Sequence, residues 1–341
     1  MEIKRITINQ ERNVTLTAYI QDVGGEFINI ERRPAMLVLP GGGYYMCSDR
    51  EAEPVALRYL EAGYQAFILR YSVAEHAAWP NPLNDYEQAM ELIRKNADEW
   101  HLYPDKVAVV GFSAGGHLAA AAATMAKNRP NAALLGYAVA GNDVKISLVN
   151  APDTTLEVDQ DTCPCFIFAS RTDNMVLVRN SMQFMQALLE HEISFESHLY
   201  AYGPHGFTVC NSSVKYGDTP MCNRIKNWVD DSLEWLKDVL GDFGEKEMTK
   251  PACTNHINGD YEEYLSEECT VGMLMENAAS RSLILPLLEK MKCLEELESG
   301  SSYGDLLKKM QLKSMLGFMG GRSEESAVIC GKLAEIKNTK R

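Results

Sequence analysis

Apolar runs alternate with amphipathic segments over the first two thirds of the chain, and this alternation constrains the fold more than any other feature. Runs rich in valine, isoleucine, leucine and phenylalanine predict buried strands; they span 35–39, 64–71, 107–110, 132–139 and 165–169, and a further strand is predicted at 195–201. Segments with helical spacing or composition follow them, at 53–62, 83–100, 117–127, 178–191 and 225–239. Strands that alternate with helices of this length are typical of a mostly parallel sheet covered on both faces. The predicted fold class is therefore α/β, with a doubly wound sheet.

The composition changes after Gly241. Residues 244–260 are polar and irregular and contain Pro251, which is typical of a linker. From Tyr261 onward no segment predicts a strand, and helical stretches are separated by glycine and serine. We therefore expect three parts: an α/β domain over 1–243, a linker over 244–260 and a small all-α domain over 261–341.

Charge and hydropathy exclude several classes of partner. The 341 residues carry a formal net charge of -14, which argues against a polyanion such as nucleic acid. No apolar run reaches the length of a membrane span, and the N-terminal residues lack the apolar core of a signal peptide. We therefore expect a cytoplasmic protein that binds neither nucleic acid nor membrane. The sequence does not indicate an oligomeric state.

The nine cysteines predict neither disulfides nor a metal site, because their number is odd and their spacing is scattered. Cys163 and Cys165 form the one close pair, and no second pair at zinc-ribbon spacing accompanies them. The chain also contains no P-loop and no dinucleotide-binding glycine fingerprint in a strand–helix context. The sequence thus predicts no metal and no organic cofactor.

One serine stands among small residues at a predicted strand-to-helix turn. The stretch GFSAGGH, residues 111–117, follows the apolar run at 107–110 and precedes an alanine-rich helix. Backbone crowding at such a turn requires small neighbours, which is the physical content of the G-x-S-x-G pattern of Gly111, Ser113 and Gly115. An ordinary glycine-rich turn is the alternative. We predict that Ser113 is a nucleophile.

Three consecutive glycines, Gly41 to Gly43, follow the predicted strand at 35–39. Sites in open parallel sheets lie at the carboxyl ends of strands, so we expect this loop beside Ser113. Glycines let backbone N–H groups approach a ligand closely. Together with the N–H of Ala114, they would stabilise an oxyanion while Ser113 attacks a carbonyl carbon. A flexible turn is the alternative.

Among the seven histidines, His205 is the predicted base. It follows a predicted strand in the loop GPHGF, and it comes after Ser113, as the chain order serine, acid, histidine requires. The other histidines lie before the serine, on helices, inside a strand or in the linker: His76, His101, His117, His191, His198 and His256. A structural loop histidine is the alternative for His205.

The predicted acid is Asp173. It lies in the loop SRTDN, which follows the predicted strand at 165–169. There a carboxylate would fix the tautomer of His205 and stabilise its imidazolium. Asp159 and Asp161 precede that strand and so lie at its other end. An ordinary turn aspartate is the alternative for Asp173.

These motifs resemble a known family. The segments LPGGGYYMCSDREAEPVALRYLEAGYQAFILRYSV, GFSAGGHLAA and YGPHGF are similar to the acetyl xylan esterases and related carbohydrate esterases of the α/β-hydrolase superfamily. The resemblance covers about residues 1–242 and implies an α/β-hydrolase fold. It implies the following site residues: Ser113 as nucleophile, Asp173 as acid, His205 as base, and Gly42, Gly43 and Ala114 as oxyanion donors.

The sequence departs from that family's pattern at two places. Pro40 stands where many relatives have a histidine before the glycines. The acid loop lacks the histidine and proline that usually surround the aspartate. The C-terminal helical part resembles small modules attached to some bacterial carbohydrate-active enzymes, and this resemblance implies no activity.

We therefore predict a serine esterase that removes short acyl groups, most of all acetyl, from sugars or oligosaccharides such as acetylated xylan. Its partner would be an ester substrate, and the acyl-enzyme would form on Ser113. A general short-chain carboxylesterase and a peptidase of the same fold are the alternatives. A non-catalytic protein whose helical tail binds a partner is the alternative from another class.

Overall fold

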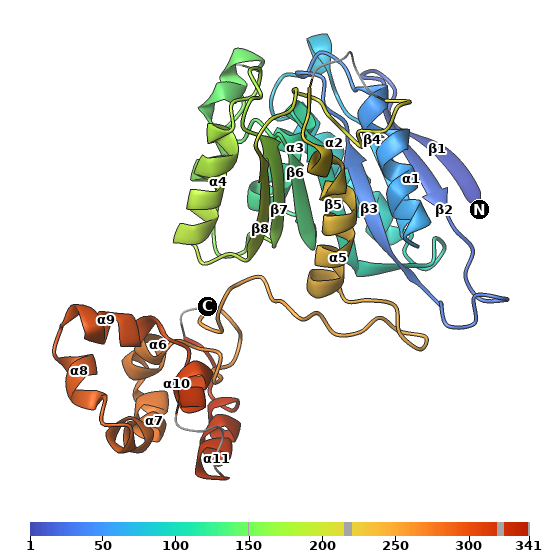
Figure 1. Ribbon diagram of the computed structural model, residues 1–341. Helices are drawn as coiled ribbons and strands as arrows, with labels where there is room; N and C mark the ends of the chain where they lie inside the picture. Colours follow the sequence, from blue (N-terminus) through green and yellow to red (C-terminus); the bar gives the residue numbers. More distant parts are fainter. Residues whose placement is uncertain (149, 215–219, 319–323, 340–341) are drawn as a thin grey trace. The chain divides into compact units, whose positions relative to one another are not determined.

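A computed structural model describes residues 1–148, 150–214, 220–318 and 324–339 (Figure 1). The chain forms two compact units, Met1–Asn255 and His256–Arg341, called here the N-terminal unit and the C-terminal unit. Within the described ranges, no helix is both long and apolar enough to cross a membrane.

The described part of the N-terminal unit contains one sheet of eight strands, in the order β1-β2-β4-β3-β5-β6-β7-β8. The strands are β1 (Glu2–Asn9), β2 (Val14–Ile20), β3 (Arg33–Leu39), β4 (Gln65–Arg70), β5 (Leu102–Phe112), β6 (Ala132–Gly136), β7 (Cys165–Ser170) and β8 (Phe195–Tyr200). β1 and β2 pair antiparallel with each other, and β2 pairs antiparallel with β4. All other neighbours are parallel, so the carboxyl ends of β3 to β8 meet at one edge of the sheet.

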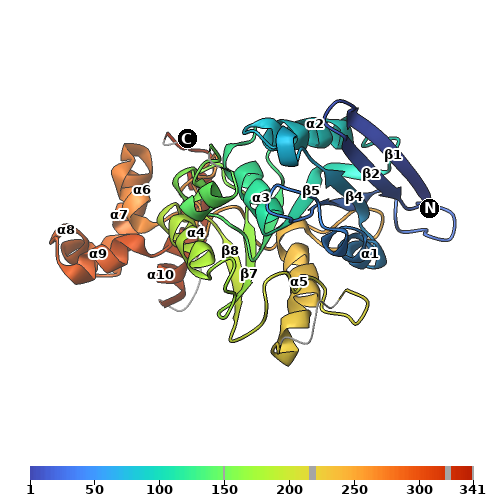
Figure 2. The same ribbon diagram turned by 90° about the horizontal axis from the view of Figure 1, so that it is seen from above.

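Helices cover both faces of this sheet, as Figure 2 shows from above. Residues of α2 (Asn81–Lys95), α3 (Ala114–Met125) and α4 (Arg179–Glu190) join one apolar cluster with one set of strand side chains. Residues of α1 (Glu53–Glu61) and α5 (Trp228–Leu240) join the other cluster with the alternate set. Successive strand side chains point to opposite faces, so a strand buried on both sides must be apolar throughout. All residues of β3 are buried, and Ala35 to Leu39 are apolar for this reason; the charged Arg33 at its start donates to the carbonyls of Gly63 and Asp22.

The predicted alternation of strands and helices is confirmed, with differences at the ends of elements. β5 begins at Leu102 rather than at Val107, because Leu102 pairs with Arg33 of β3 although polar residues follow it. α3 begins at Ala114, directly after the serine. The hairpin of β1 and β2 lies outside the predicted strands. β1 is an edge strand with no buried side chain, so it carries no apolar run.

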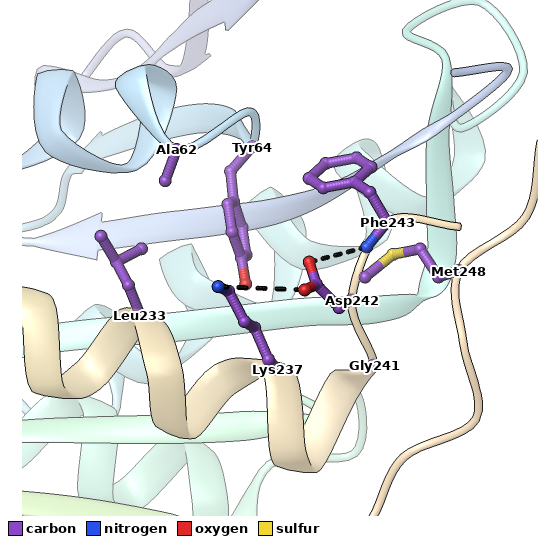
Figure 3. A pocket seen from close by; sticks show the side chains of 8 residues that line it. All are labelled: Ala62, Tyr64, Leu233, Lys237, Gly241, Asp242, Phe243 and Met248. Atoms are coloured by element: carbon purple, nitrogen blue, oxygen red, sulfur yellow. Dashed lines mark hydrogen bonds and ion pairs between the residues drawn. The ribbon is translucent and has the colours of Figure 1, made fainter. Parts of the chain in front are cut away.

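A small cavity of about 40 Å³ opens between the start of β4 and the end of α5 (Figure 3). Tyr64, Lys237 and Phe243 are among its lining residues. Tyr64 directly precedes β4, so the cavity lies at the amino-terminal edge of the parallel strands, opposite to the edge where the site is predicted. Its volume is far below the several hundred Å³ that ligand pockets usually have. It is therefore not a substrate site.

The C-terminal unit is helical and has its own apolar cluster of leucine, methionine and valine side chains. Its described helices are α6 (Val271–Glu276), α7 (Ala278–Lys290), α8 (Leu294–Glu298), α9 (Ser302–Lys309), α10 (Leu312–Phe318) and α11 (Glu324–Leu333). Side-chain oxygens of Thr270, Asn277 and Ser301 cap three of these helices by accepting backbone N–H groups. Local capping therefore defines where short helices begin.

Residues 244–255 cluster with the N-terminal unit. The N–H of Lys246 donates to the carbonyl of Asn29 at 3.1 Å, and the N–H of Ser194 donates to the carbonyl of Asn255 at 2.8 Å. The sequence predicts a domain at 1–243, a linker at 244–260 and a domain at 261–341. Whether these two domains fold independently of each other stays a prediction, which truncated chains would test.

Candidate active site

Ser113 lies in a sharp turn between β5 and α3. Its backbone has φ 52° and ψ -116°, a strained conformation for a residue with a Cβ atom. A Cβ atom at Gly111 would lie 2.1 Å from the carbonyl oxygen of Gly115, and one at Gly115 would lie 2.2 Å from that of Leu39. Both glycines are therefore steric requirements, because each lets another backbone segment pass close to the turn.

A hydrogen-bonded chain joins Ser113 to His205 and Asp173. His205 Nδ1 lies 2.7 Å from Asp173 Oδ2, and His205 Nε2 lies 3.0 Å from Ser113 Oγ. The backbone N–H groups of Met175 and Val176 donate to Asp173 Oδ1, both at 2.9 Å, so both carboxylate oxygens are engaged. A carboxylate beside Nδ1 keeps the imidazole proton on that nitrogen, which leaves Nε2 to accept the proton of Ser113. The geometry suits proton transfer from Ser113 to His205.

The glycine loop packs directly against the serine turn. A Cβ atom at Gly41 would lie 2.7 Å from the carbonyl oxygen of Phe112 and 3.0 Å from Ser113 Cβ. Gly42 and Gly43 follow with φ angles of 134° and 63°, which residues with side chains avoid. Their N–H groups donate to no other residue in the described part of the chain. The N–H of Ala114, the first residue of α3, has no acceptor within its helix. Gly41 thus brings the glycine loop against the serine turn, with Gly42 and Gly43 next in the chain and Ala114 directly after Ser113.

Two buried tyrosines hold the glycine loop. Tyr71 donates its O–H to the carbonyl of Pro40 at 2.6 Å, and Tyr44 donates its O–H to His117 Nδ1 at 2.6 Å. The second nitrogen of His117, Nε2, donates to the carbonyl of Pro152 at 2.9 Å. Burial lowers the pKa of His117 to about 4, so the ring is neutral at pH 7. With both nitrogens engaged, His117 is not available to Ser113.

Other candidates from the sequence lie in different surroundings. Asp159 forms an ion pair with Arg129 at 2.5 Å, and His198 Nε2 lies 2.8 Å from Glu196. Cys163 and Cys165 are buried free thiols. Among the described residues, no group of three or more histidine, cysteine, aspartate or glutamate side chains is arranged to hold a metal ion.

Two residues of the site escape sequence reasoning. The carboxylate of Glu51, in the short helix η1 (Asp49–Glu51), accepts the N–H of Gly41 at 2.8 Å and the O–H of Tyr137 at 2.6 Å. Tyr137 directly follows β6 at the carboxyl edge of the sheet, which is a usable signal because functional residues gather there. Glu51 gives no such signal, since it is one of three acidic residues within Asp49–Glu53.

Fold and site together define a class of protein. A serine on a strained strand-to-helix turn, followed along the chain by its acid and its histidine on later strand loops, is the arrangement of the α/β-hydrolases. The order of the eight strands, with an antiparallel hairpin at one end, carries this arrangement.

Comparisons with known proteins agree. The chain is 46% identical to MGS-M1, an α/β-hydrolase enzyme from a Medee basin deep-sea metagenome library; the match covers 70% of this chain and 98% of that one, with a TM-score of 0.67. The family model BD-FAE matches residues 29–130. The chain therefore belongs to the α/β-hydrolases, and the resemblance and the fold expected from the sequence are confirmed.

Curated relatives are larger proteins. The chain is 33% identical over 217 residues to endo-1,4-beta-xylanase B of Butyrivibrio fibrisolvens. This match covers 54% of this chain and 34% of that protein. It is 29% identical over 218 residues to an acetylxylan esterase of Xylanibacter ruminicola, which covers 57% of this chain and 45% of that protein. The chain thus spans between a third and a half of the length of these two relatives.

Proposed function

We propose that this protein is a serine esterase that hydrolyses short acyl esters, acetyl esters above all, of sugars or oligosaccharides. The observation that carries the proposal is the chain from Ser113 Oγ through His205 to Asp173, at 3.0 and 2.7 Å, beside backbone N–H groups that have no acceptor in the described chain. A nucleophile, its base, an orienting acid and oxyanion donors are the parts that acyl transfer needs.

The first half-reaction forms an acyl-enzyme. His205 Nε2 accepts the proton of Ser113 while Oγ attacks the ester carbonyl carbon. The carbonyl oxygen becomes an oxyanion that accepts N–H groups of Gly42, Gly43 and Ala114. Asp173 stabilises the imidazolium. The C–O bond to the sugar then breaks, and His205 returns the proton to the departing alkoxide oxygen.

The second half-reaction releases the acid. His205 accepts a proton from water while the water oxygen attacks the acyl carbon of the Ser113 ester. The same N–H groups stabilise the second oxyanion. When it collapses, the proton on His205 passes to Ser113 Oγ, and acetic acid or another short carboxylic acid leaves and gives its remaining proton to water. All protons are accounted for by this chain's own residues and water.

The substrate class rests on similarity. Two relatives carry names that refer to xylan, the endo-1,4-beta-xylanase B and the acetylxylan esterase, and each matches more than half of this chain. These names support a sugar ester as substrate. A general short-chain carboxylesterase is the outcome to be distinguished, since the site chemistry is the same.

The test is hydrolysis of a matched panel: acetylated xylo-oligosaccharides, acetylated monosaccharides, aryl acetate, aryl butyrate and a peptide. We expect release of acetate from the sugar esters, and loss of at least several orders of magnitude in turnover for Ser113→Ala. Ser232→Ala, at a buried serine of α5 that bonds Tyr59, is the matched control and should keep full turnover. Activity on aryl esters alone would support a general esterase and would reject the proposal that sugar esters are the substrate. Full activity of Ser113→Ala would reject the site.

A further inference from the structure

The buried carboxylate of Glu51 joins the glycine loop to the segment that follows β6. Glu51 is only 4% exposed, and its two oxygens are divided between the loops. Oε2 accepts the N–H of Gly41, which begins the glycine loop, and Oε1 accepts the O–H of Tyr137. No lysine or arginine is among these two partners. The carboxylate is therefore held by neutral donors and is costly to bury unless both bonds form.

Tyr137 continues the connection toward His205. Its oxygen accepts the N–H of Thr208 at 3.3 Å, three residues after the histidine. Its ring lies edge-on to the imidazole of His205 at 5.0 Å and to Phe207 at 4.8 Å between ring centroids. Burial raises the pKa of Tyr137 well above its usual value, so the hydroxyl keeps its proton and donates to Glu51.

The segment that carries Glu51 also holds the histidine loop through its neighbour. The carbonyl of Arg50 accepts the hydroxyl of Thr208 at 2.9 Å, and Arg50 Nη1 donates to the carbonyl of Gly206 at 3.4 Å. One helical turn, η1, thus contacts the glycine loop on one side and the loop of His205 on the other. Gly41 is only 10 positions from Glu51, whereas the bonds of η1 to Tyr137 and to the loop of His205 span 86 to 158 positions and fix parts of the chain that nothing local connects.

We propose that Glu51 and Tyr137 are positioning residues that hold the oxyanion loop and His205 in register with each other for catalysis. This inference rests on the proposed function. Oxyanion donors stabilise a transition state only when they are fixed at the position where charge develops, and a loop with two glycines at positive φ does not fix itself. The Gly41 bond to Glu51 supplies that constraint, and Tyr137 ties it to the base.

The two residues should therefore act on the transition state and not on substrate binding. Neither side chain forms a hydrogen bond with Ser113, His205 or Asp173, so the reaction steps stay the same. Misplacement of donors or base by a fraction of an ångström weakens contacts that exist only while the oxyanion is present. The expected signature is a lower kcat at nearly constant KM.

Tyr137→Phe is the sharpest variant, because it removes one oxygen and keeps the ring that packs on His205 and Phe207. We expect kcat for aryl acetate to fall by roughly ten- to hundredfold, with KM within about threefold, since one buried carboxylate and one N–H lose a partner. Glu51→Gln should lower kcat in the same range. The kcat of the double variant should lie within about threefold of the kcat of the less active single variant, because both changes break the same network.

Tyr86→Phe is the matched control. Tyr86 is a fully buried tyrosine of α2 whose O–H donates to the carbonyl of Asn128 at 2.9 Å, and this bond lies outside the site. It should cost stability like Tyr137→Phe but leave kcat unchanged. Active sites are counted by end-point labelling with a fluorophosphonate, so that kcat refers to folded enzyme only. The rate of that labelling gives a second measure that needs no ester substrate.

The outcomes separate this inference from the proposed function. Wild-type kcat per labelled site in Tyr137→Phe and Glu51→Gln would overturn the positioning role and leave the esterase intact. Losses that add fully in the double variant would also overturn it. Wild-type protein that labels with fluorophosphonate but hydrolyses no ester would reject the proposed function, and slower labelling of the two variants would still support the positioning role. If Tyr137→Phe does not fold, the rate of fluorophosphonate labelling of Glu51→Gln decides: a slower rate than wild type supports the positioning role, and an equal rate overturns it.

Discussion

The two units of the chain reach their structures by different means. In the N-terminal unit, chemistry depends on strained and crowded backbone: Ser113, Tyr44 and Tyr137 all have positive φ angles, and a Cβ atom at Gly115 would lie 2.2 Å from a carbonyl oxygen. In the C-terminal unit, short helices begin at capping side chains and pack on one apolar cluster. A Cβ atom at Gly331 would meet nothing within 4 Å in the described chain.

This difference shows where the sequence is under steric constraint. Strain persists only where surrounding structure enforces it, and here the enforcing contacts come from distant segments of the sheet. The C-terminal unit combines local capping bonds such as Ser301 to Gly304, three residues apart, with long-range bonds such as Asn338 to Asp260, and none of them belongs to the site. We therefore expect substitutions in the N-terminal unit to change turnover strongly and those in the C-terminal unit to change local stability only.

After Ser113→Ala, the largest expected effect is that of Asp173→Asn. An asparagine places an N–H₂ group or a weaker acceptor at His205 Nδ1, so the tautomer and the imidazolium both lose support. We expect turnover to fall by about 10³- to 10⁴-fold while the protein stays folded. Steady-state kinetics on aryl acetate measure it. Asp161→Asn, at an exposed position, and Asp159→Asn are the controls and should keep turnover. A large loss of turnover in either control would mean that the acid lies in the segment before β7 and that Asp173 is not the acid.

The second effect concerns His117 and pH. Its pKa is about 4 in the folded protein and about 6.5 without burial. Between these values the unfolded chain binds a proton that the folded chain does not, so the free energy of unfolding falls as pH falls through this window. The loss reaches up to about 3 kcal/mol near pH 4. Denaturant unfolding at several pH values measures it. Wild type and His117→Gln with equal pH slopes between 6.5 and 4 would contradict the assignment.

The predicted site residues follow from a rule about sheets, and the residues that support them do not. Ser113, Asp173 and His205 can be found in the sequence because each comes just after a predicted strand, and the carboxyl ends of parallel strands meet at one edge. The sequence sets His117 aside because it lies on the helix after Ser113, but its partner Tyr44 is 73 positions away and is found only in the structure. The tie between Tyr137 and Glu51 spans 86 positions and involves no repeated or spaced motif.

The same reasoning applies to the fold. Apolar runs locate the central strands, since burial on both faces demands continuous hydrophobicity. The edge strand β1 has no buried side chain, and Leu102 joins β5 ahead of Pro104 and Asp105 only because Arg33 lies opposite. Pairing between strands, rather than composition, decides these ends. The capped helices of the C-terminal unit begin at serine, threonine or asparagine, which sequence alone can indicate.

A third prediction tests whether the units are separable. A chain that ends at Asn255 keeps the bond from Ser194 to Asn255 and all site residues. We expect it to hydrolyse aryl acetate within about tenfold of the full chain, a change in barrier below ~1.4 kcal/mol. A chain that ends at Gly244 loses the bonds of Lys246 and Cys253 to Asn29 and Asp238, so it should have the same kcat and a lower melting temperature. Loss of activity in the folded longer truncation would contradict the predicted domain division.

The smallest expected effect is in the C-terminal unit, at Gly331. This residue is exposed in the last turns of α11, and a Cβ there meets no described atom within 4 Å. Alanine restricts the unfolded chain more than glycine and favours the helix, so Gly331→Ala should stabilise α11 by about 0.5–1 kcal/mol. Hydrogen exchange of α11 amides in the full chain measures this change, and kcat should be unchanged. Gly304→Ala is the contrasting variant in the same unit, since its Cβ would lie 2.1 Å from the carbonyl oxygen of Glu296 and should destabilise α9. If Gly331→Ala instead lowered kcat in protein whose N-terminal unit exchanges normally, local helix stability and turnover would be coupled, and the contrast between the two units would fail.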